Sequence, residues 1–164
     1  GTNGSVLNGA AAGDYAGQSV SAAGDLNGDG FDDLVIGAPY TSNGASYAGA
    51  SYVVFGGASG LPSPLNLSTL DASSGLKITG ASAFDYVGFS VSEAGDVNGD
   101  GFADLIIGAP SSSLGENYGG AAFVVFGSDQ PLPASLSVSG LDGDNGFAPA
   151  AHAGEHGTPM RVGE

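Results

Sequence analysis

The hydrophobic residues of this chain fall in short runs that recur along the sequence. Within one stretch of the chain, four such runs occupy residues 76–79, 90–94, 104–109 and 121–126. Each run is rich in β-branched or aromatic residues and is bounded by glycine, proline, asparagine or serine, which is typical of β-strands. None has the apolar spacing of an amphipathic helix. The pattern therefore predicts an all-β fold made of short strands.

The runs belong to a repeat whose two copies lie 71 residues apart, as Asp25 and Asp96 do, and align without a gap. Other matched pairs are Tyr15 and Tyr86, Pro39 and Pro110, Phe55 and Phe126, and Leu70 and Leu141. Repetition at a fixed period indicates a duplicated structural unit. We expect one repeat over residues 1–69, a second over 70–140, and the start of a third within 141–164.

Four strands per unit, joined by short connections and repeated head to tail, indicate the blades of a β-propeller. A solenoid coil typically takes roughly 20–45 residues per repeat, so this unit is too long for one. Repeat arrays generally need at least about three units to be stable. We therefore expect four-stranded antiparallel blades that form an incomplete segment of a propeller, with further blades supplied by the rest of the parent chain.

The repeat pattern stops after Phe147. Residues 141–147 match residues 70–76, but residues 148–164 do not continue the match, and we expect them to form an off-pattern, disordered tail. This tail contains "HAGEH" (His152–His156), which fits the H-x-x-E-H pattern of some zinc proteases. The prolines and glycines around it oppose the helix that such a site requires, so we interpret the match as chance.

Charge narrows the classes of partner. The chain has 17 acidic and two basic residues, a formal net charge of -15 and no cysteine. Such a surface repels the phosphates of nucleic acids and of anionic lipids, so we expect no nucleic acid partner. The sequence also lacks an apolar run of about 18 residues, so we expect no membrane insertion. The 41% of hydrophobic residues is nevertheless enough for a folded core.

The acidic residues gather in two glycine-rich loops, each directly before an apolar run. Oxygen-bearing side chains occupy loop positions 1, 3, 5 and 9, and the backbone carbonyl at position 7 adds another oxygen. The candidate ligands are Asp25, Asn27, Asp29, Phe31 and Asp33 in the first loop, and Asp96, Asn98, Asp100, Phe102 and Asp104 in the second. A donor set made only of oxygen suits Ca²⁺ and disfavours zinc and copper. We predict two calcium sites.

Two alternatives share parts of this pattern. An EF-hand or dockerin loop begins in the same way but needs a carboxylate at position 12, where this chain has Ile36 and Ile107. Simple Asn-Gly and Asp-Gly turns without metal would also connect strands. Such turns do not require three carboxylates at the same positions in both copies. Those carboxylates would repel one another in an empty loop.

The loop D-x-N-G-D-G-x-x-D, the following "DLVIGAP" and the downstream "YVVFG" resemble the FG-GAP repeats of integrin alpha-subunit β-propellers and their bacterial relatives. The expected "FGxSV" stands as "AGQSV" at residues 16–20 and "VGFSV" at residues 87–91. The resemblance implies a ring of seven blades with structural calcium on one face. It also implies a ligand surface on the opposite face, where residues 40–49 and 111–120 are candidate loops. Simple surface variation is the alternative interpretation of these loops, in which Tyr47 and Tyr118 recur.

The pattern contains no nucleophile with a histidine partner in the repeats, so we expect no catalysis by this chain. Asp14–Tyr15 and Asp85–Tyr86 are interpreted as turn anchors.

Three functional hypotheses remain. The first is a calcium-binding, secreted or cell-surface segment for recognition or adhesion of an unidentified protein or glycan. The second is the accessory propeller of a secreted hydrolase or lyase whose catalytic domain lies outside this chain, and the third is a structural spacer. Extracellular placement follows from the calcium supply, because weak sites fill outside cells.

Overall fold

The computed structural model describes residues 4–113 and 119–147, and this part of the chain is built from strands and two short 3₁₀ turns. In chain order the strands are β1 (Leu7–Asn8), β2 (Ser19–Gly24), β3 (Asp33–Ala38), β4 (Ala50–Val54), β5 (Leu65–Asn66), β6 (Gly75–Thr79), β7 (Ser90–Gly95), β8 (Asp104–Ala109), β9 (Ala121–Val125), β10 (Ser135–Ser137) and β11 (Gly146–Phe147). The 3₁₀ turns are η1 (Leu67–Thr69) and η2 (Val138–Gly140). The all-β class with antiparallel, blade-like sheets is confirmed. In the described ranges no helix has the length and hydrophobicity needed to span a bilayer.

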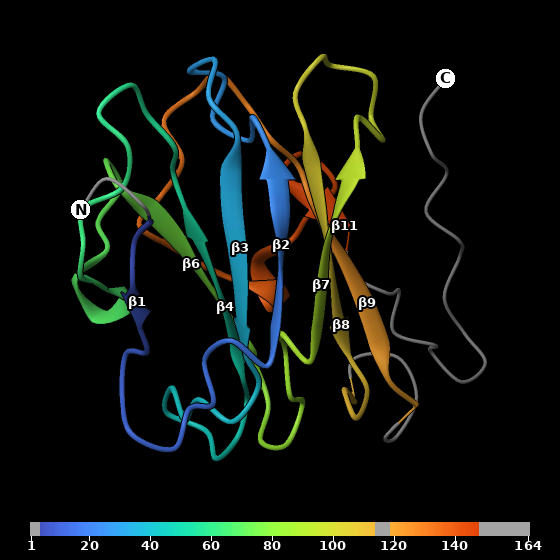
Figure 1. The fold of residues 1–164 in the computed structure, drawn as a ribbon. Coiled ribbons are helices and arrows are strands. Elements are labelled where there is room, and N and C mark those ends of the chain that lie inside the picture. Colours follow the sequence, from blue (N-terminus) through green and yellow to red (C-terminus); the bar gives the residue numbers. More distant parts are fainter. Residues whose placement is uncertain (1–3, 114–118, 148–164) are drawn as a thin grey trace, which may run out of the picture.

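Two blade-like sheets stand side by side (Figure 1). The first has the order β10-β6-β4-β3-β2, in which β2, β3, β4 and β6 are antiparallel and β10 adds a parallel edge strand. The second has the order β11-β9-β8-β7 and is antiparallel throughout. A short parallel pair, β1 and β5, lies beside the first sheet. Strands β2 and β7 pack against each other where the sheets meet.

The strand pairing corrects one expectation. Residues 76–79 were expected to share a blade with residues 90–94, 104–109 and 121–126, but the strand they form, β6, pairs with β4 of the first sheet. In the second sheet the equivalent place is taken by β11, whose Gly146 lies 71 residues after Gly75. Each blade thus takes its outer strand from the start of the next sequence repeat. The repeat boundaries at residues 69 and 140 remain a division of the sequence only.

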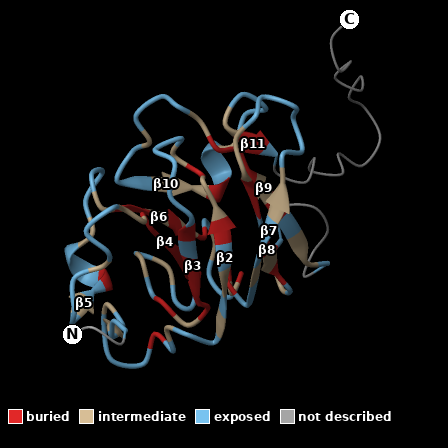
Figure 2. Ribbon diagram, turned by 45° about the horizontal axis from the view of Figure 1, so that its top comes forward, coloured by how far each residue is buried: buried red, intermediate tan, exposed pale blue. Residues whose placement is uncertain are grey.

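The main hydrophobic core lies between the two sheets (Figure 2). Val35 and Ile78 from the first sheet and Leu105, Phe123 and Val125 from the second are at most 1% exposed within it. Burial of each such side chain contributes roughly 1.5–3 kcal/mol relative to leaving it in water. The sheets are therefore held together mainly by apolar packing across their facing surfaces.

A second cluster covers the other face of the first sheet. Ile36, Tyr52 and Val54 belong to it, and the partly buried Leu7 and Leu65 pack against them. Because side chains alternate along a strand, Val35 and Ile36 point to opposite faces and both are buried. The adjacent apolar residues Val35 and Ile36 after the first acidic loop follow from this two-sided burial.

The innermost backbones of the two blades approach closely at glycine positions. A Cβ atom built on Gly37 would overlap the carbonyl oxygen of Gly88, and one on Gly88 would overlap the carbonyl oxygen of Ala50. The Ser19 hydroxyl donates a hydrogen bond of 3.0 Å to the same Gly88 carbonyl. Nearby, Gly49 forms an isolated parallel bridge with Val87. Only residues without a side chain allow this contact between blades.

The connections divide between two ends of the blades. The acidic loops, between β2 and β3 and between β7 and β8, lie at the top in Figure 1. The β3–β4 connection and the segments that precede β2 and β7 lie at the opposite end. Residues 148–164, with the expected tail and "HAGEH", fall outside the described residues, as does Tyr118.

We predict that Gly37→Ala lowers the free energy of unfolding by about 1–3 kcal/mol, because the new methyl group forces the two blades apart. Gly108→Ala is the matched control, since Gly108 holds the same place in the second repeat but the atoms nearest to its Cβ would belong to Ser90 of the same blade. Urea unfolding of the three proteins measures the difference. Equal destabilisation by both substitutions would contradict the importance of the contact between blades.

Candidate metal centre

The two acidic loops turn tightly because glycines adopt left-handed backbone conformations in them. The φ angles are 73° at Gly28 and 89° at Gly30, and 79° and 95° at Gly99 and Gly101. Residues with a Cβ adopt this region reluctantly, so the glycines permit the loop to curl around its own side chains. The two loops have the same conformation at these positions and lie at the same end of the blades.

In the first loop, side-chain oxygens accept hydrogen bonds from the backbone of the same loop. The Asp25 carboxylate accepts from the N–H groups of Asp29 and Gly30, each at 2.9 Å. The Asn27 Oδ1 atom also accepts from the Asp29 N–H, at 3.1 Å. The Asp29 carboxylate accepts from the Phe31 N–H at 2.9 Å. The loop is therefore a series of overlapping Asx turns.

The second loop repeats this network. Asp96 accepts from the N–H groups of Asp100 and Gly101 at 3.0 and 2.9 Å. The Asn98 Oδ1 atom accepts from Asp100 N–H at 3.1 Å, and Asp100 accepts from Phe102 N–H at 2.9 Å. Agreement between two sequence-separated loops indicates that the conformation follows from the shared residues.

The ninth residue of each loop is the first residue of the following strand, and its carboxylate is buried. Asp33 is 1% exposed, and its two oxygens accept from Leu26 N–H at 3.0 Å and Gly56 N–H at 2.8 Å. Asp104 is 0% exposed, and its oxygens accept from the N–H groups of Val97 at 2.7 Å and residue 127 at 3.0 Å. Each carboxylate therefore fastens the start of its loop to the segment after the third strand of the blade.

Gly56 and Gly127 contact the candidate site, and the sequence pattern did not assign them to it. Both follow the recurring Val-Val-Phe run, and each is 23 residues after the aspartate to which its N–H donates. The recurrence of "VVFG" was the available signal. Nothing in that motif shows that its glycine meets an aspartate.

The pKa of the Asp33 carboxyl rises from 3.8 to about 6, because burial disfavours its ionised form. The N–H groups of Gly56 and Leu26 lower the pKa, while the negative charges of Asp29 and Asp25 raise it further. The repulsion expected among the loop carboxylates is therefore present in the first loop.

The chemistry of the donor set fits calcium, since the ten candidate residues offer carboxylate, amide and carbonyl oxygens. The side chains are nevertheless turned toward backbone amides, and Asn27 Nδ2 donates to Asp29 Oδ2 at 3.0 Å. Among the described residues, no group of three or more histidine, cysteine, aspartate or glutamate side chains is placed to hold a metal ion. The fold thus places the five predicted ligands of each site in a single loop, but it does not bring their carboxylates together at one point.

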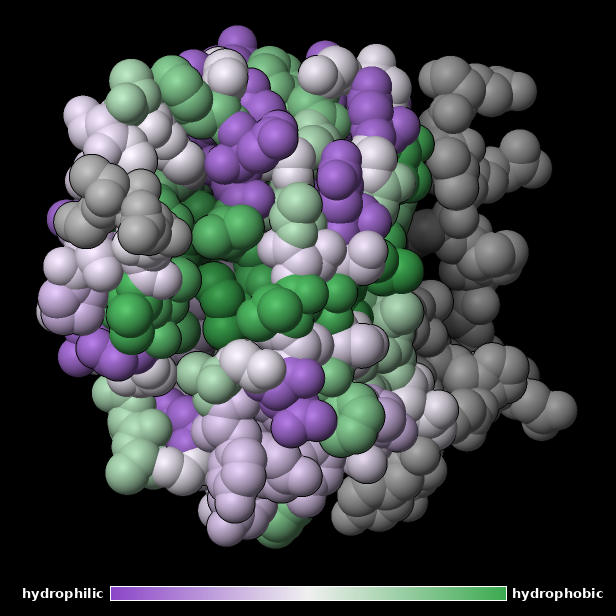
Figure 3. Space-filling model, viewed as in Figure 1, coloured by the Kyte–Doolittle hydropathy of each residue, from purple (hydrophilic) through white to green (hydrophobic). Residues whose placement is uncertain are grey.

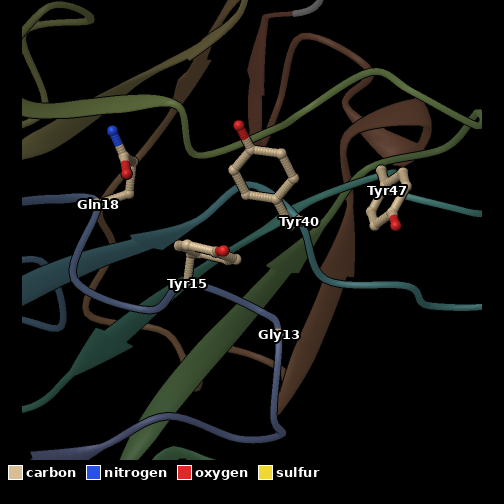
Figure 4. A pocket seen from close by; sticks show the side chains of 5 residues that line it. All are labelled: Gly13, Tyr15, Gln18, Tyr40 and Tyr47. Atoms are coloured by element: carbon tan, nitrogen blue, oxygen red, sulfur yellow. The ribbon is translucent and has the colours of Figure 1, made fainter.

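The opposite end of the blades carries the candidate ligand loop 40–49 and the Asp-Tyr pairs. Asp85 accepts hydrogen bonds from Ser82 N–H at 2.8 Å and Ser113 N–H at 3.4 Å, which agrees with a turn-anchoring role. Tyr47 of the candidate loop is 44% exposed and lines an open pocket of about 500 Å³ (Figure 4). The candidate loop 111–120 lies partly outside the described residues.

We predict that, in the presence of a chelator, the free energy of unfolding falls as pH rises from about 4 to about 6. Below this window Asp33 is protonated in both states. Within it the unfolded chain releases the proton near its ordinary pKa of 3.8, while the folded chain retains it up to about 6, so rising pH favours unfolding. Urea unfolding at several pH values measures the slope.

Asp33→Asn removes the ionisable group and should make this decline shallower. The amide also has only one acceptor oxygen for two N–H donors, so the substitution should itself cost about 1–3 kcal/mol. Asp32→Asn is the control, because Asp32 is exposed and adjacent. If the free energy of unfolding declined with the same slope in Asp33→Asn as in the unsubstituted protein, the assignment of this pH dependence to Asp33 would be contradicted.

Comparison with known proteins agrees with the geometry of the blades. Residues 16–54 and 87–125 each match the family model described as FG-GAP repeat. The first match covers β2, β3 and β4, and the second covers β7, β8 and β9. Each sheet thus contains one family repeat.

The chain is similar to several curated proteins. It is 39% identical to integrin alpha-3 of Cricetulus griseus over 113 residues, which are 69% of this chain and 10% of the relative. It is 36% identical to integrin alpha-PS5 of Drosophila melanogaster over 155 residues, 94% of this chain and 13% of the relative. It is 39% identical to phosphatidylinositol-glycan-specific phospholipase D of Rattus norvegicus over 113 residues, 68% of this chain and 13% of the relative.

The chain therefore spans only 10–13% of the length of these relatives. Within that span, the family matches, the similarity to integrin alpha subunits and the two blade-like sheets agree. The chain is an FG-GAP repeat protein, with one repeat in each of its two blades.

Proposed function

We propose that this chain is a calcium-binding β-propeller segment of a secreted or cell-surface protein, with calcium in a structural role and with recognition or adhesion as the function of the propeller. One observation carries the calcium part of the proposal. Two loops 71 residues apart, beginning at Asp25 and Asp96, fold into the same turn and place the same oxygen donors at the same end of the blades.

Electrostatics supports a cation in these loops. Burial raises the pKa of Asp33, and the negative charges of Asp29 and Asp25 raise it further, so a nearby positive charge would favour the ionised form of Asp33. Each carboxylate oxygen has a second lone pair, so an oxygen that already accepts an N–H can still bind a cation. Side chains such as Asn27 and Asp29 would have to turn from their mutual hydrogen bond toward the ion.

A structural role is supported by the contacts of the first loop with the second blade. Ala103 N–H donates to the Asp25 carbonyl at 3.3 Å, and Ser128 N–H donates to the Leu26 carbonyl at 2.9 Å. A Cβ on Gly28 would lie 2.6 Å from the Phe102 ring. An ion that orders the loop would therefore also order the junction between the blades.

The outer faces of the two sheets support the proposal that the parent protein has further blades. Leu34 is 37% exposed on the first sheet, while Leu105, which holds the same place in the second, is 0% exposed between the blades. Leu34 lies with Leu7 and Val20 along an apolar groove, and Figure 3 shows hydrophobic surface across this region. On the far side of the second sheet, Ile106 is 39% exposed. Both faces suit the packing of another blade.

The accessory propeller of an enzyme is the second candidate. It is favoured by the similarity to phosphatidylinositol-glycan-specific phospholipase D. In this case too the described blades bind calcium and do not carry catalysis. A catalytic constellation elsewhere in the parent chain would select this candidate over an adhesion protein.

We predict that calcium raises the melting temperature and that each loop binds one ion. At free calcium tenfold above the dissociation constant, each site adds about 1.4 kcal/mol to the free energy of unfolding. Isothermal titration calorimetry should give a stoichiometry of two, falling to one in Asp25→Ala or Asp96→Ala and to none in the double variant.

Asp32→Ala is the control for lost charge, because the exposed Asp32 lies in the first loop but is not a candidate ligand. Its stoichiometry should stay at two. The proposal fails if the melting temperature is the same in calcium and in chelator.

A further inference from the structure

Five aromatic rings form a cluster at the end of the blades opposite the acidic loops. We call Tyr15, Tyr40, Tyr47, Phe84 and Tyr86 the aromatic cluster. The Tyr40 ring centroid lies 5.0 Å from that of Tyr15, 5.9 Å from that of Tyr47 and 5.5 Å from that of Tyr86. The planes of Tyr47 and Tyr86 are stacked, with an angle of 12° between them. Both blades therefore contribute rings to one surface.

The backbone of this cluster is held in an unfavourable conformation. Four of its members, Tyr15, Tyr47, Phe84 and Tyr86, have φ angles of 54°, 51°, 66° and 55°, and they are the only described residues other than glycine with positive φ. This region costs roughly 1–2 kcal/mol per residue for a side chain with a Cβ. Tyr15 is nevertheless 66% exposed, and Tyr47 and Phe84 are each 44% exposed. Burial thus offsets the strain only in part, a combination typical of functional sites.

The residues that line the pocket beside this cluster all belong to the first repeat. It is lined by Gly13, Tyr15, Gln18, Tyr40 and Tyr47, and Figure 4 shows the three tyrosine rings and Gln18 around it. Three lining positions differ in the second repeat. Residues 84, 89 and 111 there are Phe, Phe and Ser, in place of Gly, Gln and Tyr. The second blade folds without these lining residues, so the blade itself does not require them.

The lining combines ring faces with neutral polar groups. No lining side chain is charged. Within the described part of the chain, the hydroxyls of Tyr15, Tyr40 and Tyr47 and the amide of Gln18 have no hydrogen-bond partner. A volume of about 500 Å³ lies within the roughly 300–1,000 Å³ range of small-molecule sites. The pocket therefore offers aromatic surface together with free donors and acceptors.

We propose that this pocket binds a neutral glycan. One face of a pyranose ring consists of C–H groups that pack against tyrosine rings, while its hydroxyls both donate to and accept from the Gln18 amide and the tyrosine hydroxyls. The net charge of -15 opposes sulfated or carboxylated sugars. The inference rests on the recognition role proposed above and names its ligand class.

The test uses the full chain with calcium present. Cellotriose, maltotriose and chitotriose are titrated as neutral probes, with a heparin disaccharide as the anionic probe and arginine amide as the cationic one. Isothermal titration calorimetry and saturation-transfer NMR report binding.

Tyr40→Ser introduces the residue that stands at position 111 of the second repeat, and Tyr47→Asn keeps a residue that tolerates positive φ. Phe89→Ala, at the position equivalent to Gln18, is the control because it removes an exposed aromatic ring that does not line the pocket.

We expect at least one neutral trisaccharide to bind. Tyr40→Ser and Tyr47→Asn should each weaken this binding about tenfold, the effect of losing one stacked ring, and Phe89→Ala should leave it unchanged. The inference is overturned if no neutral probe binds, if only arginine amide binds, or if both tyrosine variants keep full affinity.

A calcium titration of the same sample separates the two proposals. Calcium binding without saccharide binding overturns the glycan inference alone. Saccharide binding that depends on Tyr40 and Tyr47, in a sample that does not bind calcium, supports the pocket and overturns the calcium role.

Discussion

A buried aspartate at the start of the second strand of each blade connects the parts of the structure that matter most. Asp33 and Asp104 each bind one backbone N–H at the start of the acidic loop and another beyond the third strand. Burying a carboxylate is unfavourable unless its oxygens are paired, and two backbone donors provide that pairing. The loop conformation and the blade are thereby linked through one side chain. A change in the charge of the loop should therefore also affect the stability of the sheet.

The two ends of the blades differ in how closely the two repeats match. At one end, acidic loops of matching conformation in the two repeats meet across the junction between the blades, where Ala103 N–H reaches the Asp25 carbonyl. At the other end, the two repeats differ, and the first carries Tyr40 where the second carries Ser111. The acidic loops are repeated, whereas three of the five residues that line the aromatic pocket, Gly13, Gln18 and Tyr40, are not.

Much of the fold could be predicted from the sequence because each strand is a short apolar run with clear boundaries, and the runs recur at one period. The acidic loops were also evident, since side-chain oxygens at alternate positions and glycines at fixed places have a direct geometric meaning. The grouping of the strands into blades could not be predicted, because a sequence repeat does not show which of its strands begins a blade. The pairing of Lys77 with Tyr52, which assigns β6 to the first sheet, depends on contacts far apart in the chain. For the same reason Gly56 could not be linked to Asp33, and the rings from two blades could not be assigned to one surface.

The central claim is that each acidic loop holds one calcium ion on the residues that the sequence repeats. Crystals grown with calcium, with X-ray data collected at a long wavelength, test this directly through the anomalous scattering of the ion. The result expected is one anomalous peak in each loop, surrounded only by oxygen atoms at about 2.3–2.6 Å, with Asp25 and Asp96 among the ligands. Loops without an anomalous peak, in which Asn27 still donates to Asp29, would contradict it.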